Sequence, residues 1–136
     1  MIVDTMVLAY ALLGVEGYRE QAANALDRSN ILEAPDSLKA ELTNVVWQWI
    51  VRRGVSFHLG REVLWNSISI VDRYIPVEVC WERALVLAVE KNHPAYDTLF
   101  IAAAEYSGTV CLTSDTKLIE TFPDQTIGLE KLSNYG

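Results

Sequence analysis

Two short apolar runs near opposite ends of the chain each lead into an aspartate. Met1–Val3 precedes Asp4, and residues 109–113 precede Ser114 and Asp115. Each run has the length and composition of a buried strand in a parallel sheet. The carboxyl ends of parallel strands meet at one edge of an open α/β sheet, where ligands bind. We therefore expect Asp4 and Asp115 to be neighbours in space.

Short strands alternate with helical segments along the rest of the chain, and glycines and prolines separate them. We expect strands at 1–4, 31–34, 74–77 and 109–113, an edge strand at Ile127, and helices at 5–13, 18–28, 59–71, 79–91 and 114–121, with two more between Asp36 and Gly54 and between Pro94 and Gly108. Gly14 and Gly17 should break the first helix, Pro35 should end the second strand, and Asp36 should cap the next helix.

This alternation predicts the fold class α/β, as a three-layer α/β/α sandwich with a short, mostly parallel sheet. The length fits a single domain over residues 1–136, and 51% of the residues are hydrophobic, which is enough for a core.

Four acidic residues are candidates for one site, and each has a purely structural alternative. Asp4 can be a surface turn residue, but the apolar residues that follow it keep the chain close to the core. Glu41 can be an ordinary helix glutamate, although it borders the buried face and no capping residue stands three positions earlier. Asp97 and Asp115 each stand near a helix start, where aspartate is a favoured N-cap.

A pocket that gathers these carboxylates would attract a divalent cation. Like charges at short range repel one another, and hard cations prefer oxygen ligands. Asn44 lies about one helical turn after Glu41, on the same side of the predicted helix, and is a candidate partner for that carboxylate.

The other residues narrow the function further. The formal net charge of −7 argues against a protein that binds nucleic acid by bulk charge, although an acidic metal site inflates that count.

Cys80 and Cys111 lie in apolar segments, which indicates buried thiols in a reducing cytoplasm. His58 and His93 have no partner at metal-ligand spacing and are interpreted as surface or packing histidines. No apolar run is long enough to span a membrane, and no nucleophile elbow is present, so we expect a cytoplasmic protein without a Ser or Cys nucleophile.

Four stretches of the chain resemble the motifs of PIN-domain ribonucleases, and they look most like those of the VapC-type toxins of prokaryotic toxin–antitoxin pairs. The stretches are Ile2–Leu8, Ala40–Trp47, Tyr96–Glu105 and Leu112–Leu118. Their order and spacing match the family from Ile2 to about residue 130, which is nearly the whole chain.

The resemblance implies a metal-dependent endoribonuclease. In that family the matching acidic residues hold Mg²⁺ or Mn²⁺, so these roles fall to Asp4, Glu41, Asp97 and Asp115, and Thr113 matches a hydroxyl near the last aspartate. The implied substrate is RNA, cleaved to 5′-phosphate and 3′-hydroxyl ends. The implied partners are a small antitoxin protein and a second copy of the chain.

Met6 departs from the family pattern, which commonly has Asn or Ser two positions after the first aspartate. A thioether is only a weak hydrogen-bond acceptor. A catalytically weak or inactive PIN domain that binds a partner or RNA therefore stays open as an alternative. Two other phosphoryl-transfer folds fit less well. Haloacid-dehalogenase-like enzymes have a second aspartate where Met6 stands, and receiver domains have an acidic pair at a strand end, which this chain lacks.

Overall fold

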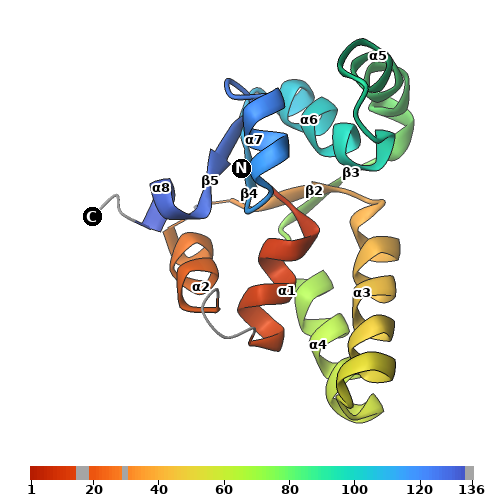
Figure 1. Ribbon diagram of the computed structural model, residues 1–136, viewed down its shortest axis with the longest axis vertical. Coiled ribbons are helices and arrows are strands. Elements are labelled where there is room, and N and C mark those ends of the chain that lie inside the picture. Colours follow the sequence, from red (N-terminus) through yellow and green to blue (C-terminus); the bar gives the residue numbers. More distant parts are fainter. Residues whose placement is uncertain (15–18, 29–30, 134–136) are drawn as a thin grey trace.

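A five-stranded parallel sheet forms the centre of the protein (Figure 1). The structure is a computed structural model and describes residues 1–14, 19–28 and 31–133. Within these residues the strands are β1 (Ile2–Val3), β2 (Glu33–Pro35), β3 (Arg73–Ile75), β4 (Cys111–Thr113) and β5 (Thr126–Gly128). Their order across the sheet is β3-β2-β1-β4-β5, so β1 is central and β4 lies directly beside it.

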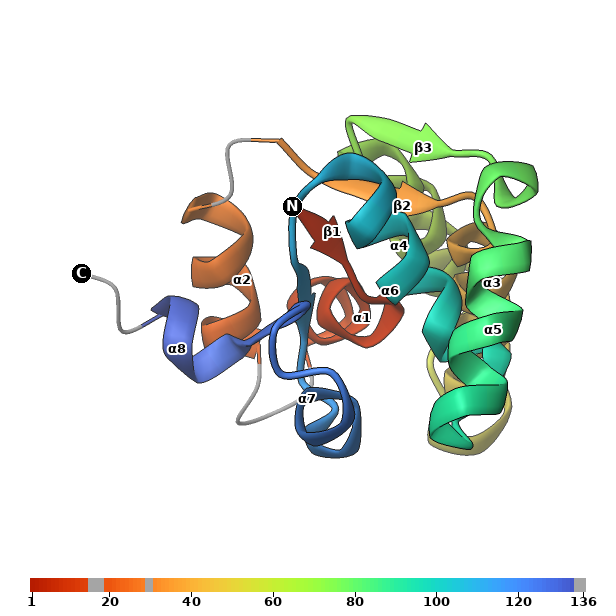
Figure 2. The same ribbon diagram turned by 90° about the horizontal axis from the view of Figure 1, so that it is seen from above.

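Helices cover both faces of this sheet. They are α1 (Thr5–Leu13), α2 (Arg19–Arg28), α3 (Leu38–Arg53), α4 (Phe57–Ile70), α5 (Trp81–Lys91), α6 (Ala95–Ser107), α7 (Thr116–Thr121) and α8 (Leu129–Ser133), with a 3₁₀ turn η1 (Val77–Val79) before α5. Figure 1 shows α1 to α4 on one side of the sheet and α5 and α6 on the other. Helix α6 packs on β1, β2 and β4, and Figure 2 shows α5 lying alongside it. The predicted three-layer α/β/α sandwich is therefore confirmed.

The three central strands, β1, β2 and β4, are short and buried throughout, whereas the edge strands β3 and β5 are partly exposed. Ile2 and Leu112 have no exposed surface, and Phe100 from α6 packs with them in the same apolar core. Burial on both faces explains why these strands are continuous apolar runs in the sequence. Cys80 and Cys111 are buried free thiols, as predicted. Among the helices of the described residues, none has the length and apolar character that a membrane span requires.

Three of the predicted helix ends are confirmed at glycines. Gly14, Gly54 and Gly108 follow α1, α3 and α6 with φ angles of 71°, 67° and 66°. Glycine adopts this left-handed conformation without the steric penalty of a Cβ atom, so it ends a helix readily. The predicted break at Gly17 and helix start at Tyr18 lie outside the described residues.

Of two predictions at the end of β2, one is confirmed and one is wrong. The strand ends at Pro35, as predicted, although Pro35 is itself the last strand residue and pairs with Ile75 of β3. It is tolerated because the pairing of β1 with β2 stops before it, where a missing N–H costs no ladder bond. Asp36 does not cap α3, because Ser37 occupies the cap position. Instead, Oδ1 of Asp36 accepts a hydrogen bond from the backbone N–H of Val77 at 3.1 Å and links the ends of β2 and β3.

Other boundaries differ by a turn or less. Helix α4 begins at Phe57, before the predicted residue 59, because the Ser56 side chain caps it by accepting the N–H of Leu59. The predicted helix 79–91 is divided into η1 and α5, and α7 begins at Thr116 instead of residue 114. The short helix α8 was not predicted.

Candidate active site

A cavity of about 730 Å³ opens where β1 and β4 end. Its lining includes all four acidic residues selected from the sequence, Asp4, Glu41, Asp97 and Asp115. Asp4 directly follows β1, Glu41 lies in α3, Asp97 lies in the first turn of α6, and Asp115 stands between β4 and α7. The topology therefore brings together carboxylates from four separate segments, while their role as metal ligands stays a prediction.

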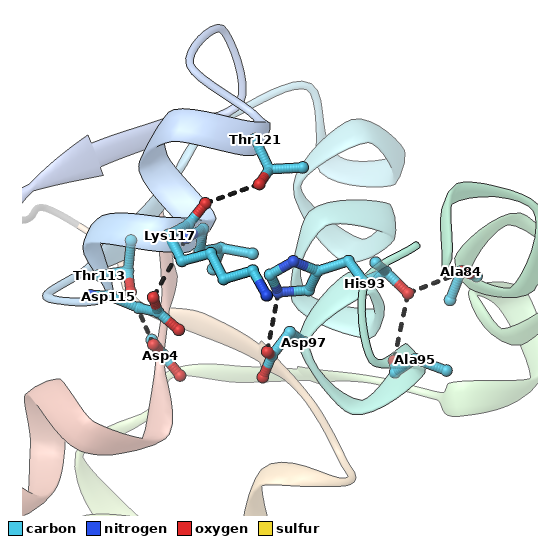
Figure 3. A network of polar contacts seen from close by, with 11 residues as sticks. Asp4, Ala84, His93, Ala95, Asp97, Thr113, Asp115, Lys117 and Thr121 are labelled. Carbon is cyan, nitrogen blue, oxygen red and sulfur yellow. Dashed lines mark hydrogen bonds and ion pairs between the residues drawn. The ribbon is translucent and has the colours of Figure 1, made fainter. Parts of the chain in front are cut away.

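Thr113 connects the two aspartates at the strand ends. Its hydroxyl is fully buried, donates to Oδ2 of Asp4 at 2.7 Å and accepts the backbone N–H of Asp115 at 3.0 Å (Figure 3). This geometry follows from the parallel pairing of β1 with β4, which aligns Val3 with Leu112. One oxygen of Asp4 is thereby fixed.

Asp115 is also the N-cap of α7. Its Oδ1 accepts the backbone N–H of Leu118 at 3.1 Å, which satisfies one of the unpaired donors at the helix start. Asp115 therefore does cap a helix, as its structural interpretation from the sequence predicts. The cap does not exclude a role in the cavity, because a carboxylate has a second oxygen.

Asp97 is held by a residue whose role the sequence analysis missed. Pro94 occupies the N-cap position of α6, so the capping alternative for Asp97 is wrong. Oδ2 of Asp97 lies 2.9 Å from Nε2 of His93 (Figure 3). The His93 side chain is 2% exposed. The sequence does contain a signal for this contact. His93 and Asp97 are four residues apart, and Pro94 between them marks the start of a helix, so the two side chains lie about one turn apart on the same side.

One carboxylate oxygen of Glu41, Oε2, is buried without a hydrogen-bond partner among the described residues. A buried unpaired carboxylate oxygen is costly, so such a group is usually found where a ligand or a proton completes it. Asn44 also lines the cavity, about one turn further along α3, and its role as a partner of Glu41 stays a prediction.

The cavity strongly disfavours negative charge. Burial raises the pKa of Asp4 from 3.8 to about 6, and the charges of Asp97 and Asp115 add to this rise, whereas the hydrogen bond from Thr113 opposes it. Burial likewise raises the pKa of Glu41 from 4.5 to about 7, with further contributions from the charges of Asp4 and Asp97. Asp4 and Glu41 therefore lie in the field of neighbouring carboxylates, and a bound cation would relieve that repulsion.

The residues at the cavity fit a hard divalent cation. The donors are carboxylate oxygens, and within the described residues no lysine or arginine forms an ion pair with any of the four. Oε2 of Glu41 has no hydrogen-bond partner at bonding distance among the described residues, although the nearby Thr5 hydroxyl lowers the pKa of this carboxyl and partly offsets the rise due to burial. Among the described residues, however, no three His, Cys, Asp or Glu side chains are arranged so that they could hold a metal ion directly. Mg²⁺ normally keeps several waters, and water can bridge such a spread set.

Met6 lines the same cavity and is partly exposed. The departure from the family pattern that was noted in the sequence therefore falls within the site itself. The cavity wall at this point offers only a weak hydrogen-bond acceptor to a ligand or a water.

The chain belongs to the PIN domain family, whose model matches residues 1–122. Among curated proteins it is similar to Ribonuclease VapC3 of Pyrobaculum aerophilum, with 31% identity over 127 residues that cover 90% of this chain and 95% of the relative. It is also 29% identical over 94 residues to Ribonuclease VapC12 of Mycobacterium tuberculosis, covering 69% of this chain and 71% of that protein. The resemblance noted in the sequence is confirmed, as a distant homology to VapC ribonucleases.

Solved structures confirm the fold. The crystal structure of PAE2754 from Pyrobaculum aerophilum superposes with a TM-score of 0.75 at 22% identity, covering 97% of this chain and 85% of that one. A toxin–antitoxin complex from Klebsiella pneumoniae gives a TM-score of 0.72 at 18% identity, covering 94% and 96%. At these identities the likeness shows a shared architecture.

Proposed function

We propose that this protein is a metal-dependent endoribonuclease that hydrolyses RNA phosphodiester bonds in the acidic cavity, and that it is the toxin of a type II toxin–antitoxin pair. The observation that carries the proposal is the convergence of Asp4, Glu41, Asp97 and Asp115 on one cavity. The relatives named as ribonucleases support the reaction class.

The four carboxylates would hold Mg²⁺ or Mn²⁺ through their oxygens and through water. When bound, such an ion supplies positive charge to the scissile phosphate and lowers the pKa of an attacking water. The chain's own residues orient this chemistry: Thr113 fixes one oxygen of Asp4, and α3 presents Glu41 from the opposite wall. Asp97 is the proposed acceptor of the proton that the water loses. The resulting hydroxide adds to phosphorus, the P–O3′ bond breaks, and the leaving 3′ oxygen takes a proton from solvent, so that the products are a 5′-phosphate and a 3′-hydroxyl.

The decisive experiment compares RNA cleavage by the wild type and by Asp4→Asn, with and without Mn²⁺. We expect Mn²⁺-dependent cleavage that Asp4→Asn abolishes. Asp124→Asn is the matched control, because Asp124 is an exposed aspartate outside the cavity lining. Equal cleavage by wild type and Asp4→Asn would disprove the assignment.

One observation favours a second candidate function. Met6 replaces a polar side chain at the cavity, which suits a weakly active or inactive PIN domain that serves as a binding module for RNA or a protein. A module without metal would gain stability from Asp4→Asn, since the substitution removes a buried like charge. A nuclease would lose Mn²⁺ binding through the same substitution, so calorimetric titration with Mn²⁺ separates the two.

The proposed partners follow from the same site. A cognate antitoxin would cover the cavity, and an arginine of that protein suits it because a guanidinium pairs well with carboxylates. A second copy of the chain would complete a homodimer. Co-expression with the product of the adjacent gene, followed by light scattering of the purified complex, tests both.

A further inference from the structure

We infer that His93 is a positioning residue for Asp97: it fixes one oxygen of that carboxylate from within the core and leaves the other for the cavity. This inference rests on the proposed function, because it assigns a role within the same site. The contacts of His93 in the structure support it. The sequence analysis did not place His93 among the residues of the acidic site.

The backbone places His93 at a tight elbow between two helices. Asn92 ends α5 in the left-handed conformation with φ 49°, and the N–H of His93 donates to the carbonyl of Ala88 at 3.1 Å. Pro94 then begins α6. Because both neighbours constrain the backbone, the direction of the His93 side chain is set by the elbow and points inward, where it is 2% exposed.

The imidazole ring is packed as well as hydrogen-bonded. Its edge faces the ring of Phe122, with centroids 6.0 Å apart and planes at 78°. Phe122 is itself buried, directly after α7. The ring is therefore clamped between α6 and the end of α7, and Figure 3 shows it beside Asp97, on the same side of the site as Lys117 and Thr121 of α7.

The hydrogen-bonding chemistry assigns a donor role to His93. An ionised carboxylate only accepts hydrogen bonds, so the proton of the pair belongs on Nε2, which lies 2.9 Å from Oδ2 of Asp97. Nδ1 is buried and makes no hydrogen bond with any described residue. If His93 served packing alone, an apolar ring would avoid the free-energy cost of the buried, unpaired Nδ1. The hydrogen bond of Nε2 to Asp97 gives a reason for a histidine at this position.

Asp97 and Asp4 are restrained in the same way. Each has its Oδ2 bound by a buried side chain, His93 for Asp97 and Thr113 for Asp4. Groups of this kind orient metal-binding carboxylates, and their removal typically weakens metal affinity or activity by roughly 10- to 100-fold. His93 would thus restrict Asp97 to one free oxygen and one orientation.

The test uses Mn²⁺ affinity, measured by calorimetry, in two variants of His93. His93→Phe keeps an aromatic ring against Phe122 and removes the unpaired Nδ1, so the fold should be retained. It removes the donor, and we expect Mn²⁺ affinity to fall by roughly 10-fold or more. His93→Gln offers an amide N–H at a similar reach and should restore much of the affinity. His58→Phe is the control for a lost histidine, because His58 is exposed on α4 and pairs with Glu62.

A double-mutant cycle separates positioning from a general effect on structure. In an Asp97→Asn background, where the charged acceptor is gone, His93→Phe should change Mn²⁺ affinity little further. Wild-type affinity in His93→Phe, or an equal loss with and without Asp97, would overturn the inference while leaving the nuclease proposal intact. Failure of the wild type to bind Mn²⁺ at all would overturn the proposed function and the role of His93 together.

Discussion

The hydroxyl of Thr113 donates to Oδ2 of Asp4 across 2.7 Å and so joins the end of β4 to the residue that follows the adjacent strand β1, near the opposite end of the chain. Thr113→Val keeps the shape but leaves that oxygen and the N–H of Asp115 without their partner. We expect the free energy of unfolding at pH 8, from urea titration, to fall by about 1–3 kcal/mol. Thr113→Ser keeps the hydroxyl and should lose less; a fully stable valine variant would contradict the prediction.

The raised pKa of Glu41 makes the metal-free protein sensitive to pH. A carboxyl whose pKa is higher in the folded state stabilises the fold below its unfolded pKa, here near 4.5, and this contribution is lost as the pH rises through about 7. In the presence of a chelator, Glu41→Gln should therefore gain stability relative to the wild type between pH 5 and pH 8. The exposed control Glu120→Gln should follow the wild type across the same range, measured by thermal unfolding.

Divalent cations should stabilise the fold through the same carboxylates. At a free Mn²⁺ concentration one hundred times its Kd, the free energy of unfolding should rise by about 2.7 kcal/mol, if the unfolded chain binds none. Affinity should increase from pH 5 to pH 8, because ligand carboxylates with raised pKa values must lose their protons first. Asp4→Asn should remove most of the stabilisation. An unchanged melting temperature on adding Mn²⁺ to the wild type would count against the metal site.

Asp115 combines a helix cap with a proposed ligand, and two substitutions separate these roles. Asp115→Ser retains a capping oxygen for the N–H of Leu118 and loses the carboxylate. It should fold with near wild-type stability and bind Mn²⁺ more weakly. Asp115→Ala should also lose about 1 kcal/mol of stability with the cap. Equal Mn²⁺ affinity in wild type and Asp115→Ser would restrict Asp115 to its structural role.

Met6 should limit catalysis without limiting the fold. Met6→Asn places a donor and an acceptor on the cavity wall, and we expect a higher kcat for Mn²⁺-dependent RNA cleavage. Met6→Leu is the matched apolar control and should resemble the wild type. An unchanged kcat in Met6→Asn would show that the departure from the family pattern has no catalytic cost.

The parts of the structure that local chemistry determines could be predicted from the sequence. Gly14, Gly54 and Gly108 end helices because of their own backbone freedom, and the apolar runs before Asp4 and Asp115 are strands because both faces are buried. Because β1 and β4 pair in parallel, their carboxyl ends lie side by side, so the proximity of Asp4 and Asp115 follows from these two strands alone.

The errors fall where a distant segment decides the outcome. Asp36 accepts a hydrogen bond from the backbone N–H of Val77, near the end of another strand, instead of capping its own helix. The interpretation of His93 as a surface or packing residue agrees with its packing against Phe122 but misses its hydrogen bond to Asp97. Phe122 follows His93 by a whole helix, strand and helix, so no local pattern predicts that packing contact.

The position of β4 has a consequence for synthesis. A nascent chain that has reached α6 already contains Asp4, Glu41 and Asp97, but it lacks the strand that pairs beside β1 and the hydroxyl that restrains the first aspartate. The acidic edge can therefore assemble only after residues 111–115 have emerged from the ribosome and β4 has paired beside β1.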